Sequence, residues 1–333
     1  MSIEIKKCAV LGAGVMGAQI AGHIANAGIP SLLYDINDDL AKKGVEGLTK
    51  LKPAPLFSSK NSSLITPCTY DNDLEKLNDC DLIIEAVAEK IEIKHSVYKS
   101  LLPHLKDDAI LASNTSGIPL ANLVEVLPDE VQSRFLISHF FNPPRYLRLL
   151  ELVKGPKTSD EVYHTVTEFG ETTLGKGIVH AKDTPGFIGN RLINASGPLT
   201  FHKAMEFGLT VEDVDALSGT LIGNAKSAYF RTQDVVGLDT ALNVMNNMYD
   251  RVTTESEEER QKFKAPDLLV KLVEDGRLGQ KSGQGWYKKE GKEILSLDFD
   301  TMEYTPTKKR MFDTIRVGKP IKDLKKRLNA ITY

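Results

Sequence analysis

One stretch of the sequence places a histidine and a glutamate where they could share a proton. His139 ends an apolar run, Pro143-Pro144 marks a turn, and Leu147–Val153 has the pattern of a strand that contains Glu151. Side chains alternate along a strand, so Glu151 shares a face with aliphatic neighbours. A carboxylate in such surroundings is costly unless it is paired, and His139 is the nearest candidate across the turn.

This pair of side chains suits general acid–base chemistry. An imidazole, with an ordinary pKa of about 6.5, can accept a proton near neutral pH. A carboxylate on its other nitrogen fixes the tautomer and stabilises the imidazolium that forms. Taken alone, the stretch is better explained by a buried core histidine and a solvent-facing acid. The choice depends on what the rest of the chain supplies.

A glycine-rich motif follows the first expected strand, Lys7–Leu11. It reads Gly12-Ala13-Gly14-Val15-Met16-Gly17. A helix of small and apolar residues is expected from there to about Ala27, and a second strand, Ser31–Tyr34, ends at Asp35. This order of strand, GxGxxG, helix, strand and acidic residue is typical of dinucleotide-binding sites.

Each part of the motif has a physical role. Gly12 permits the tight turn, Gly14 lets the backbone approach a pyrophosphate, and Gly17 allows close packing of helix on strand. The helix N-terminus offers unpaired N–H groups and a positive dipole end to the phosphates. Asp35 can accept both hydroxyls of the adenosine ribose and would repel a 2′-phosphate, so we expect NAD rather than NADP. The alternative is a glycine turn that binds no nucleotide.

The first half of the chain alternates strands and helices, which predicts an α/β fold with a doubly wound parallel (Rossmann) sheet. Further strands are expected at Leu82–Val87, Ala109–Ser113 and Phe135–Ser138, and helices at Asn37–Leu51, Ile91–Leu102 and Leu120–Leu127. Ligands bind at the carboxyl ends of such strands. The polar residues expected at these ends are Glu85, Glu89, Asn114, Ser116 and His139.

The second half is predicted to be a smaller, all-helical domain. Asp183-Thr184-Pro185 has the pattern of a helix start, and a helix carrying Asn190 is expected to run to about Phe207. Further helices are expected at Val211–Leu217, Leu238–Tyr249 and Pro266–Asp275. The predicted domains are residues 1–183 for NAD binding, 184–296 for substrate and dimer contacts, and 297–333 as a solvated basic tail or linker. The tail's basic residues include Lys308, Lys309, Arg310, Lys322, Lys325, Lys326 and Arg327.

The composition excludes several classes of protein. The chain has 333 residues, enough for two domains, with 42 basic and 45 acidic side chains and a net charge of −3. We therefore expect no nucleic-acid partner, and no apolar run is long enough to predict a membrane span. Three cysteines without CxxC spacing indicate neither disulfides nor a metal site, which favours the cytoplasm.

Several motifs together resemble the 3-hydroxyacyl-CoA dehydrogenase family. In chain order they are VLGAGVMGAQIA (Val10–Ala21), IIEAVAEKIEIK (Ile83–Lys94), ASNTSG (Ala112–Gly117), SHFFNPP, LELVKG, KDTPGFIGNRL (Lys182–Leu192), VVGLDT (Val235–Thr240) and RLGQKSGQGWY (Arg277–Tyr287). The likeness covers about residues 5–290. It looks most like the dehydrogenase part of microbial fusions that also carry an enoyl-CoA hydratase.

The resemblance implies the catalytic and substrate-binding residues. His139 would be the general base and Glu151 its orienting partner. Ser116 and Asn190 would hydrogen-bond the substrate oxygen near C3, and Asn142 would help shape the same pocket. With these neighbours implied, the His139–Glu151 pair becomes the favoured explanation of its stretch.

The resemblance also extends the cofactor site. Glu89 and Lys94 would lie beside the nicotinamide ribose, and Asn114 near the nicotinamide. The full expected cofactor-binding set is Gly12, Ala13, Gly14, Val15, Met16, Gly17, Asp35, Ala86, Val87, Glu89, Lys94 and Asn114.

The resemblance implies an NAD-dependent (S)-3-hydroxyacyl-CoA dehydrogenase of fatty acid metabolism (β-oxidation), acting reversibly on an acyl-CoA substrate. It further implies a homodimer and functional pairing with an enoyl-CoA hydratase. We expect a preference for short acyl chains, as in 3-hydroxybutyryl-CoA and acetoacetyl-CoA. One reason is that the motifs are most similar to those of the fusion proteins. The other is that the helical arm after the strand of Asp35, which helps to hold the CoA tail in the family, is short here and broken by Pro53 and Pro55. A second departure from the family pattern is Gly223–Arg231, which replaces a GPF-type turn.

Two alternatives remain open at the level of sequence. One is a dehydrogenase of a free 3-hydroxy acid or sugar acid, as in relatives that oxidise gulonate. The other is a non-catalytic, NAD-binding protein of the crystallin sort. The presence together of His139, Glu151, Ser116 and Asn190 argues against the second.

Overall fold

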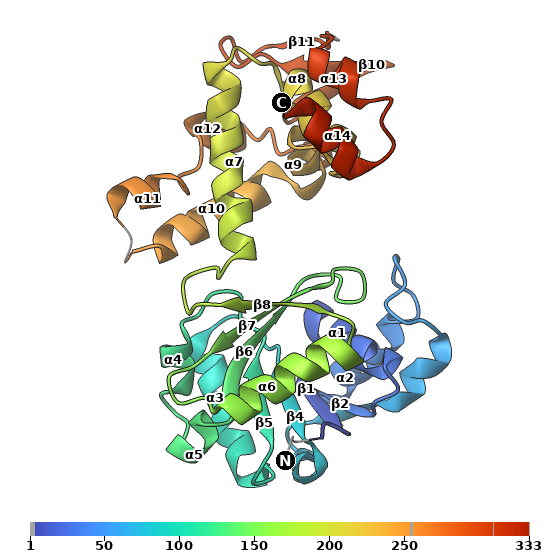
Figure 1. Ribbon diagram of the computed structural model, residues 1–333, viewed down its shortest axis with the longest axis vertical. Helices are drawn as coiled ribbons and strands as arrows, with labels where there is room; N and C mark the ends of the chain where they lie inside the picture. The colour runs from blue at the N-terminus through green and yellow to red at the C-terminus, as the bar shows by residue number, and fades with distance from the viewer. Residues whose placement is uncertain (1–3, 254–255, 309, 333) are drawn as a thin grey trace. The chain divides into compact units, whose positions relative to one another are not determined.

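The chain forms two compact units, residues 1–190 and 191–333, in a computed structural model that describes residues 4–253, 256–308 and 310–332 (Figure 1). Unit 1 is an α/β domain and unit 2 is mainly helical. The boundary at Asn190 lies beyond the one expected at 183–184.

Unit 1 is built on an eight-stranded sheet in the order β3-β2-β1-β4-β5-β6-β7-β8. The strands are β1 (Cys8–Leu11), β2 (Ser31–Asp35), β3 (Ile65–Thr69), β4 (Leu82–Glu85), β5 (Ile110–Ser113), β6 (Phe135–Phe140), β7 (Leu149–Lys154) and β8 (Gly177–Ala181). All neighbouring pairs are parallel except β6 and β7, which form an antiparallel hairpin. The predicted Rossmann sheet is confirmed. The sequence patterns did not predict β3 and β8.

Helices cover both faces of this sheet, which is why β1, β4, β5 and β6 read as continuous apolar runs. They are α1 (Val15–Asn26), α2 (Asp38–Gly47), α3 (Ile91–Leu101), α4 (Leu120–Val124), α5 (Asp129–Gln132) and α6 (Asp160–Glu168). Short turns are η1 (Ser59–Leu64), η2 (Leu74–Asp79), η3 (Leu102–His104) and the π-helical η4 (Phe169–Thr173).

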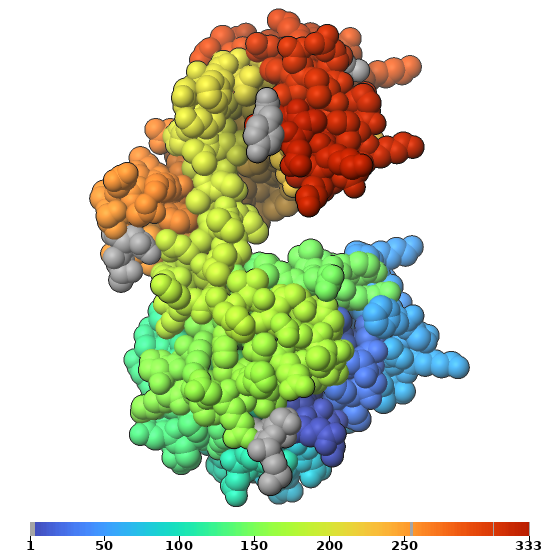
Figure 2. Space-filling view, in the orientation of Figure 1, coloured from blue at the N-terminus to red at the C-terminus, as the bar shows by residue number. Residues whose placement is uncertain are grey.

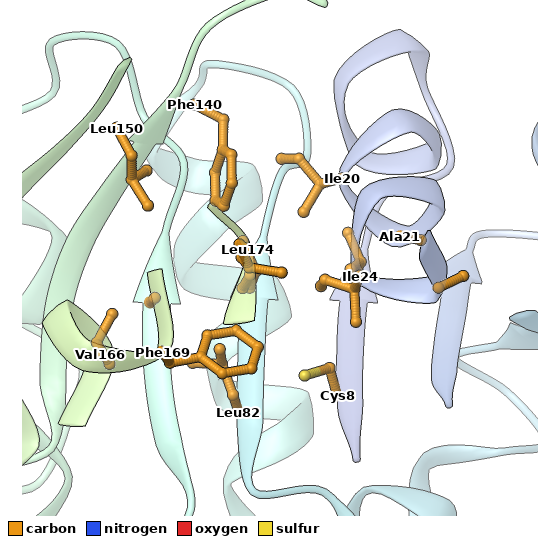
Figure 3. Packing of buried hydrophobic residues seen from close by; sticks show 14 of the residues in the cluster. Cys8, Ile20, Ala21, Ile24, Leu82, Phe140, Leu150, Val166, Phe169 and Leu174 are labelled. Carbon is orange, nitrogen blue, oxygen red and sulfur yellow. The ribbon is translucent and has the colours of Figure 1, made fainter. Parts of the chain in front are cut away.

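Two apolar layers hold the helices to the sheet. On one face Ile20 and Ile24 of α1 join Val166 of α6 over Leu82 and other strand residues, as Figure 3 shows. On the other face α3, α4 and α5 pack around residues such as Tyr98 and Phe135. The layers fix the carboxyl ends of the strands as one rigid edge, which is where the polar residues lie.

Unit 2 packs around a cluster of aromatic rings. Phe201, Phe230, Trp286 and Phe299 contact one another with ring centroids 4.7–6.1 Å apart. Its helices are α7 (Gly189–Glu206), α8 (Val211–Ser218), α9 (Phe230–Val236), α10 (Leu238–Arg251), α11 (Glu257–Gln261), α12 (Asp267–Glu274), α13 (Asp313–Gly318) and α14 (Leu324–Ile331). The remaining elements are η5 (Thr220–Ile222), η6 (Gln280–Ser282), β9 (Tyr287–Glu290), β10 (Glu293–Leu297) and β11 (Tyr304–Pro306).

The prediction that a helix starts at Asp183-Thr184-Pro185 is wrong. The helix begins only at Gly189, because Gly186 and Phe187 have φ values of 72° and 49°, which no right-handed helix accommodates. Phe187 turns into the core of unit 1, where it is 2% exposed. The Asp183 carboxylate accepts the backbone N–H of Leu120 at 3.0 Å and so binds the start of α4 instead.

The segment expected as a solvated basic tail is folded onto unit 2. Arg327 of α14 donates to the carbonyl oxygen of Thr220 at 2.7 Å, and Leu324 covers Gly223 so closely that a Cβ there would lie 2.7 Å from Leu324 Cδ2. In Figure 2 this C-terminal segment forms a continuous part of the surface of the unit. Lys309 lies outside the described residues.

Candidate active site

His139 and Glu151 are cross-strand neighbours. The antiparallel register of β6 and β7 places them directly opposite each other, so both side chains leave the same face of the sheet. His139 Nδ1 lies 2.8 Å from Glu151 Oε2. Glu151 is fully buried and His139 is 6% exposed. Since an ionised carboxylate can only accept, Nδ1 carries the hydrogen and Nε2 is the basic nitrogen of the ring.

The second oxygen of Glu151 binds the beginning of α7. Its Oε1 accepts the backbone N–H groups of Ile188 at 3.0 Å and Gly189 at 2.6 Å. Together with His139 Nδ1–H, three donors satisfy a carboxylate that burial alone would make costly. Phe187, whose φ of 49° is left-handed, directly precedes these two N–H groups.

Aromatic rings fix the orientation of the imidazole. The ring of His139 lies 4.5 Å from that of Phe141 and 5.5 Å from that of Phe187, centroid to centroid. Gly189 makes room for this packing, because a Cβ there would lie 2.6 Å from Phe141 Cζ. The imidazole is therefore held by its carboxylate and by two ring contacts.

The three glycines after β1 have different surroundings. A Cβ on Gly12 would lie 2.7 Å from the carbonyl oxygen of Ala86, and one on Gly17 would lie 1.8 Å from the carbonyl oxygen of Gly12. Apart from its two chain neighbours, no atom of the described residues comes within 4 Å of a Cβ placed on Gly14. Gly12 and Gly17 thus serve the fold, while Gly14 leaves open space at the N-terminus of α1, as a pyrophosphate would require.

The other predicted residues of this loop take different positions. Val15 is 67% exposed at the helix start, and Met16 packs partly against the core. Asp35 ends β2 beside the loop, and its Oδ2 accepts the Ala13 N–H at 2.8 Å. The arrangement fits the adenosine half of NAD, with the Asp35 carboxylate placed to meet ribose hydroxyls.

Glu89 and Ser116, from the loops after β4 and β5, are brought together. Glu89 Oε1 accepts the backbone N–H of Ser116 at 2.9 Å, its Oγ at 3.2 Å and Thr115 Oγ1 at 2.7 Å. Burial raises the pKa of Glu89, but the Lys94 ammonium and these donors outweigh it and hold the pKa below its ordinary value.

Lys94 is buried rather than open to a ligand. It is 1% exposed, and its Nζ lies 2.7 Å from Glu85 Oε1 and 3.2 Å from Glu89 Oε2. In this structure Lys94 contacts the candidate site through Glu89. Its position beside the nicotinamide ribose stays a prediction.

The asparagines form a second group. Asn114 Oδ1 accepts the N–H of Phe140 at 2.8 Å, which fixes the residue after His139. Asn142 Oδ1 accepts Nε2 of Gln19 at 3.1 Å. Asn190 is half-buried in the first turn of α7, directly after Gly189.

Gln19, which the sequence analysis did not single out, contacts the predicted site residue Asn142. It is 7% exposed on α1 and also donates to the carbonyl oxygen of Val15 at 3.2 Å. The available signal was a long polar side chain within an otherwise small and apolar helix that follows the glycine motif.

Metal ligands and membrane spans were also sought. The described residues contain no group of three or more His, Cys, Asp or Glu side chains that could hold a metal ion. Within the same residues, every helix is too short or too polar to traverse a bilayer.

Two family models match consecutive parts of the chain. Residues 7–184 match "3-hydroxyacyl-CoA dehydrogenase, NAD binding domain", and residues 186–289 match "3-hydroxyacyl-CoA dehydrogenase, C-terminal domain". A "Probable 3-hydroxyacyl-CoA dehydrogenase" of Deinococcus radiodurans is 43% identical over 90% of this chain and 87% of its own length. A protein of Bacillus subtilis with the same description is 42% identical over the whole chain, but the chain spans only 44% of that relative.

Solved structures agree with the family match. "(S)-3-hydroxybutyryl-CoA dehydrogenase PaaH1" from Ralstonia eutropha has a TM-score of 0.71, with 28% identity over 86% of this chain and 100% of that one. FadB2 of Mycobacterium tuberculosis has a TM-score of 0.70, with 32% identity over 86% of this chain and 99% of that one.

Proposed function

Because the chain belongs to the 3-hydroxyacyl-CoA dehydrogenase family, we propose that it reversibly transfers hydride between C3 of an (S)-3-hydroxyacyl-CoA ester and NAD. The observation that supports this most is the His139–Glu151 pair, at the same sheet edge as a glycine loop and acidic residue suited to NAD. NAD, when bound, supplies the hydride acceptor at its nicotinamide.

His139 acts as the general base. In the direction of alcohol oxidation its Nε2 takes the proton of the C3 hydroxyl, and it returns the proton in the reverse direction. Glu151 keeps Nδ1 protonated and stabilises the imidazolium. The N–H groups of Ile188 and Gly189 hold the carboxylate in place during both steps.

Three polar side chains bind the substrate beside this pair. Ser116 and Asn190 donate hydrogen bonds to the oxygen on C3, where negative charge develops as the proton leaves. Asn142, held by Gln19, shapes the same pocket. Glu89 fixes the position of Ser116 through its backbone N–H. The Ser116 hydroxyl donates its single hydrogen to Glu89 in this structure and turns it to the oxygen on C3 when substrate binds.

We propose a short acyl chain, as in 3-hydroxybutyryl-CoA. The name of the Ralstonia relative and the segment interrupted by Pro53 and Pro55 support it. NADH absorbance is followed with acetoacetyl-CoA and with longer 3-ketoacyl-CoA esters. Turnover that is fastest with acetoacetyl-CoA is expected. No turnover with any of these esters would refute the dehydrogenase assignment.

The two alternatives are outcomes of the same assay. Free acetoacetate, or a sugar acid such as gulonate with NAD, replaces the CoA ester in parallel reactions. Turnover of the free acid without competition by CoA would make the chain a hydroxy-acid dehydrogenase. Tight NADH binding without turnover of any substrate would make it a non-catalytic binding protein.

We further propose a homodimer and a cytoplasmic location. Ile193, Val236 and Val244 are exposed apolar residues that line one hollow of unit 2, which supports contact with a second copy. The three cysteines are buried free thiols, as suits a reducing compartment. Sedimentation equilibrium of the chain and of Val244→Lys tests the dimer, which the charge is expected to dissociate.

We also propose pairing with an enoyl-CoA hydratase. Support comes from two Rickettsia relatives described as "Putative fatty acid oxidation complex trifunctional enzyme", of which this chain spans 43% and 44%. Co-sedimentation of the purified chain with such a hydratase tests it. Independent sedimentation of the two proteins would contradict it.

A further inference from the structure

Glu85, at the end of β4, is a fully buried carboxylate with four hydrogen-bond donors. Its Oε1 accepts the Val87 N–H at 2.8 Å and the Lys94 ammonium at 2.7 Å. Its Oε2 accepts Tyr98 Oη at 2.9 Å and Ser113 Oγ at 2.7 Å. These donors come from the loop after β4, from α3 and from β5. One side chain therefore ties together three segments of the edge that carries the site.

A chain of contacts leads from Glu85 to Ser116. Lys94 bridges Glu85 Oε1 and Glu89 Oε2, and Glu89 in turn accepts both the N–H and the Oγ of Ser116. Lys94 is 1% exposed, so its ammonium is committed to these two carboxylates. Displacing Glu85 would release Lys94, then Glu89, and with it Ser116.

The order of the strands in the sheet locates the contacts between Glu85 and Ser116 relative to the cofactor site. Asp35 marks the adenosine side at β2, and the glycine loop follows the adjacent β1. Beyond β1 lie β4, β5 and β6, and the loop after β4 contacts Gly12 through Ala86. An NAD bound in this way would extend its nicotinamide half over the ends of β4 and β5, toward His139.

The network also carries an excess of negative charge. Two carboxylates, Glu85 and Glu89, share the single ammonium of Lys94. A buried negative excess stabilises a nearby cation more than a neutral group. The nicotinamide ring is cationic in NAD⁺ and neutral in NADH, so the network distinguishes the two forms.

We propose that Glu85 is a positioning residue that fixes Val87 directly and Ser116 through Lys94 and Glu89, and that this network favours oxidised over reduced cofactor. The inference rests on the proposed function for Ser116 but, for the cofactor, only on NAD binding.

Two variants separate position from charge. Glu85→Gln keeps the size of the side chain but lowers the net charge of the network from −1 to 0. Glu85→Gln/Lys94→Met removes the buried ion pair as a unit, so it avoids leaving an unpaired charge and restores the net charge of −1 through Glu89. Ser113→Ala is the matched control, because it removes one donor from Glu85, and the acceptor of the Thr115 N–H, without changing any charge.

The readouts are the Kd values of NAD⁺ and NADH, measured by fluorescence titration, and the kcat with acetoacetyl-CoA. For Glu85→Gln we expect about a tenfold fall in kcat and a severalfold weaker binding of NAD⁺ relative to NADH. In the double variant the ratio of the two Kd values should return to that of the wild type while kcat stays low, since Glu89 no longer has Lys94. Ser113→Ala should change each quantity less than Glu85→Gln does.

A Glu85→Gln protein with wild-type kcat and an unchanged Kd ratio would overturn the proposal. If Glu85→Gln does not fold, the test rests on Glu85→Gln/Lys94→Met. A wild-type kcat in this double variant would show that Glu85 does not position Ser116. The cofactor titrations need no substrate. Failure of the wild type to turn over CoA esters would therefore refute the proposed function without deciding the role of Glu85 in cofactor binding.

Discussion

His139 and Glu151 occupy opposed positions on two antiparallel strands, and this register holds imidazole and carboxylate 2.8 Å apart. Both side chains project from the rigid sheet rather than from loops, which favours a precise geometry. Glu151 is in turn held by the N–H groups of Ile188 and Gly189. The pair depends on the hairpin and on the start of α7 together.

Replacing Glu151 by glutamine should disable the base. An amide cannot accept all three N–H donors with one oxygen, and its own NH₂ group would oppose His139 Nδ1–H or the start of α7. We expect kcat with acetoacetyl-CoA to fall by about 10²- to 10⁴-fold, with the Kd of NADH within about twofold of the wild type. Glu168→Gln, at an exposed position on α6, is the control and should retain full activity. A near-normal kcat for Glu151→Gln would remove Glu151 from the mechanism.

The choice of cofactor should depend on the charge of Asp35. In Asp35→Asn the side-chain oxygen can still accept the Ala13 N–H, so the glycine loop keeps this contact, while the bond from the Ile36 N–H to the second carboxylate oxygen is lost. The repulsion of a 2′-phosphate is also lost. We expect the ratio of the Kd values for NADPH and NADH to fall by about tenfold or more, equivalent to roughly 1.4 kcal/mol. Titration of both reduced cofactors measures it. An unchanged ratio would mean that another group selects NAD.

The sequence predicts the parts of the site that follow from local patterns. Strand alternation placed Glu151 among aliphatic side chains, and the glycine spacing with Asp35 identified the cofactor loop. Both rest on short-range periodicity, which the fold preserves. The sheet itself followed from the alternation of strands and helices.

The parts that the sequence could not predict depend on contacts between distant segments. Gly186 and Phe187 break what reads as a helix start, and a left-handed phenylalanine is rare without tertiary packing. The burial of Lys94 between Glu85 and Glu89 likewise requires β4, α3 and the following loop to be in place. The conformational preferences of neighbouring residues in the sequence therefore predict neither the left-handed Phe187 nor the buried Lys94.

Gly14 offers a test of cofactor binding that leaves the fold intact. A Cβ at this position meets no atom of the described residues within 4 Å other than those of its two chain neighbours, so Gly14→Ala should unfold at the wild-type denaturant concentration. Because the same Cβ would occupy the space where a pyrophosphate approaches the helix, we expect the Kd of NADH to rise about tenfold or more. Gly47→Ala is the matched control, since its Cβ is equally free but lies at the end of α2. Equal NADH affinity in the two variants would exclude Gly14 from the cofactor site.

A histidine outside the catalytic pair should make unit 1 sensitive to acid. His23 on α1 is 7% exposed, and its Nε2 lies 3.0 Å from the carbonyl oxygen of Leu174. Burial, together with the cationic Lys176 and Arg145, lowers its pKa to about 4, despite the hydrogen bond to Leu174. Burial also lowers the pKa of Lys176 to about 8, which leaves it largely charged in acid.

Between pH 6.5 and 4 the unfolded chain therefore binds a proton at His23 that the folded chain does not, so stability falls as the pH falls through this window. The loss amounts to about 3 kcal/mol at pH 4. His23→Gln can still donate to Leu174 but does not titrate, so its free energy of unfolding should fall less steeply, as measured by urea titration at pH 7 and pH 4.5. His164→Gln, on the exposed side of α6, should keep the wild-type pH dependence. The substitution replaces only the group that takes up the proton. If the free energy of unfolding falls equally with pH in the wild type and in His23→Gln, protonation of His23 does not cause the loss of stability.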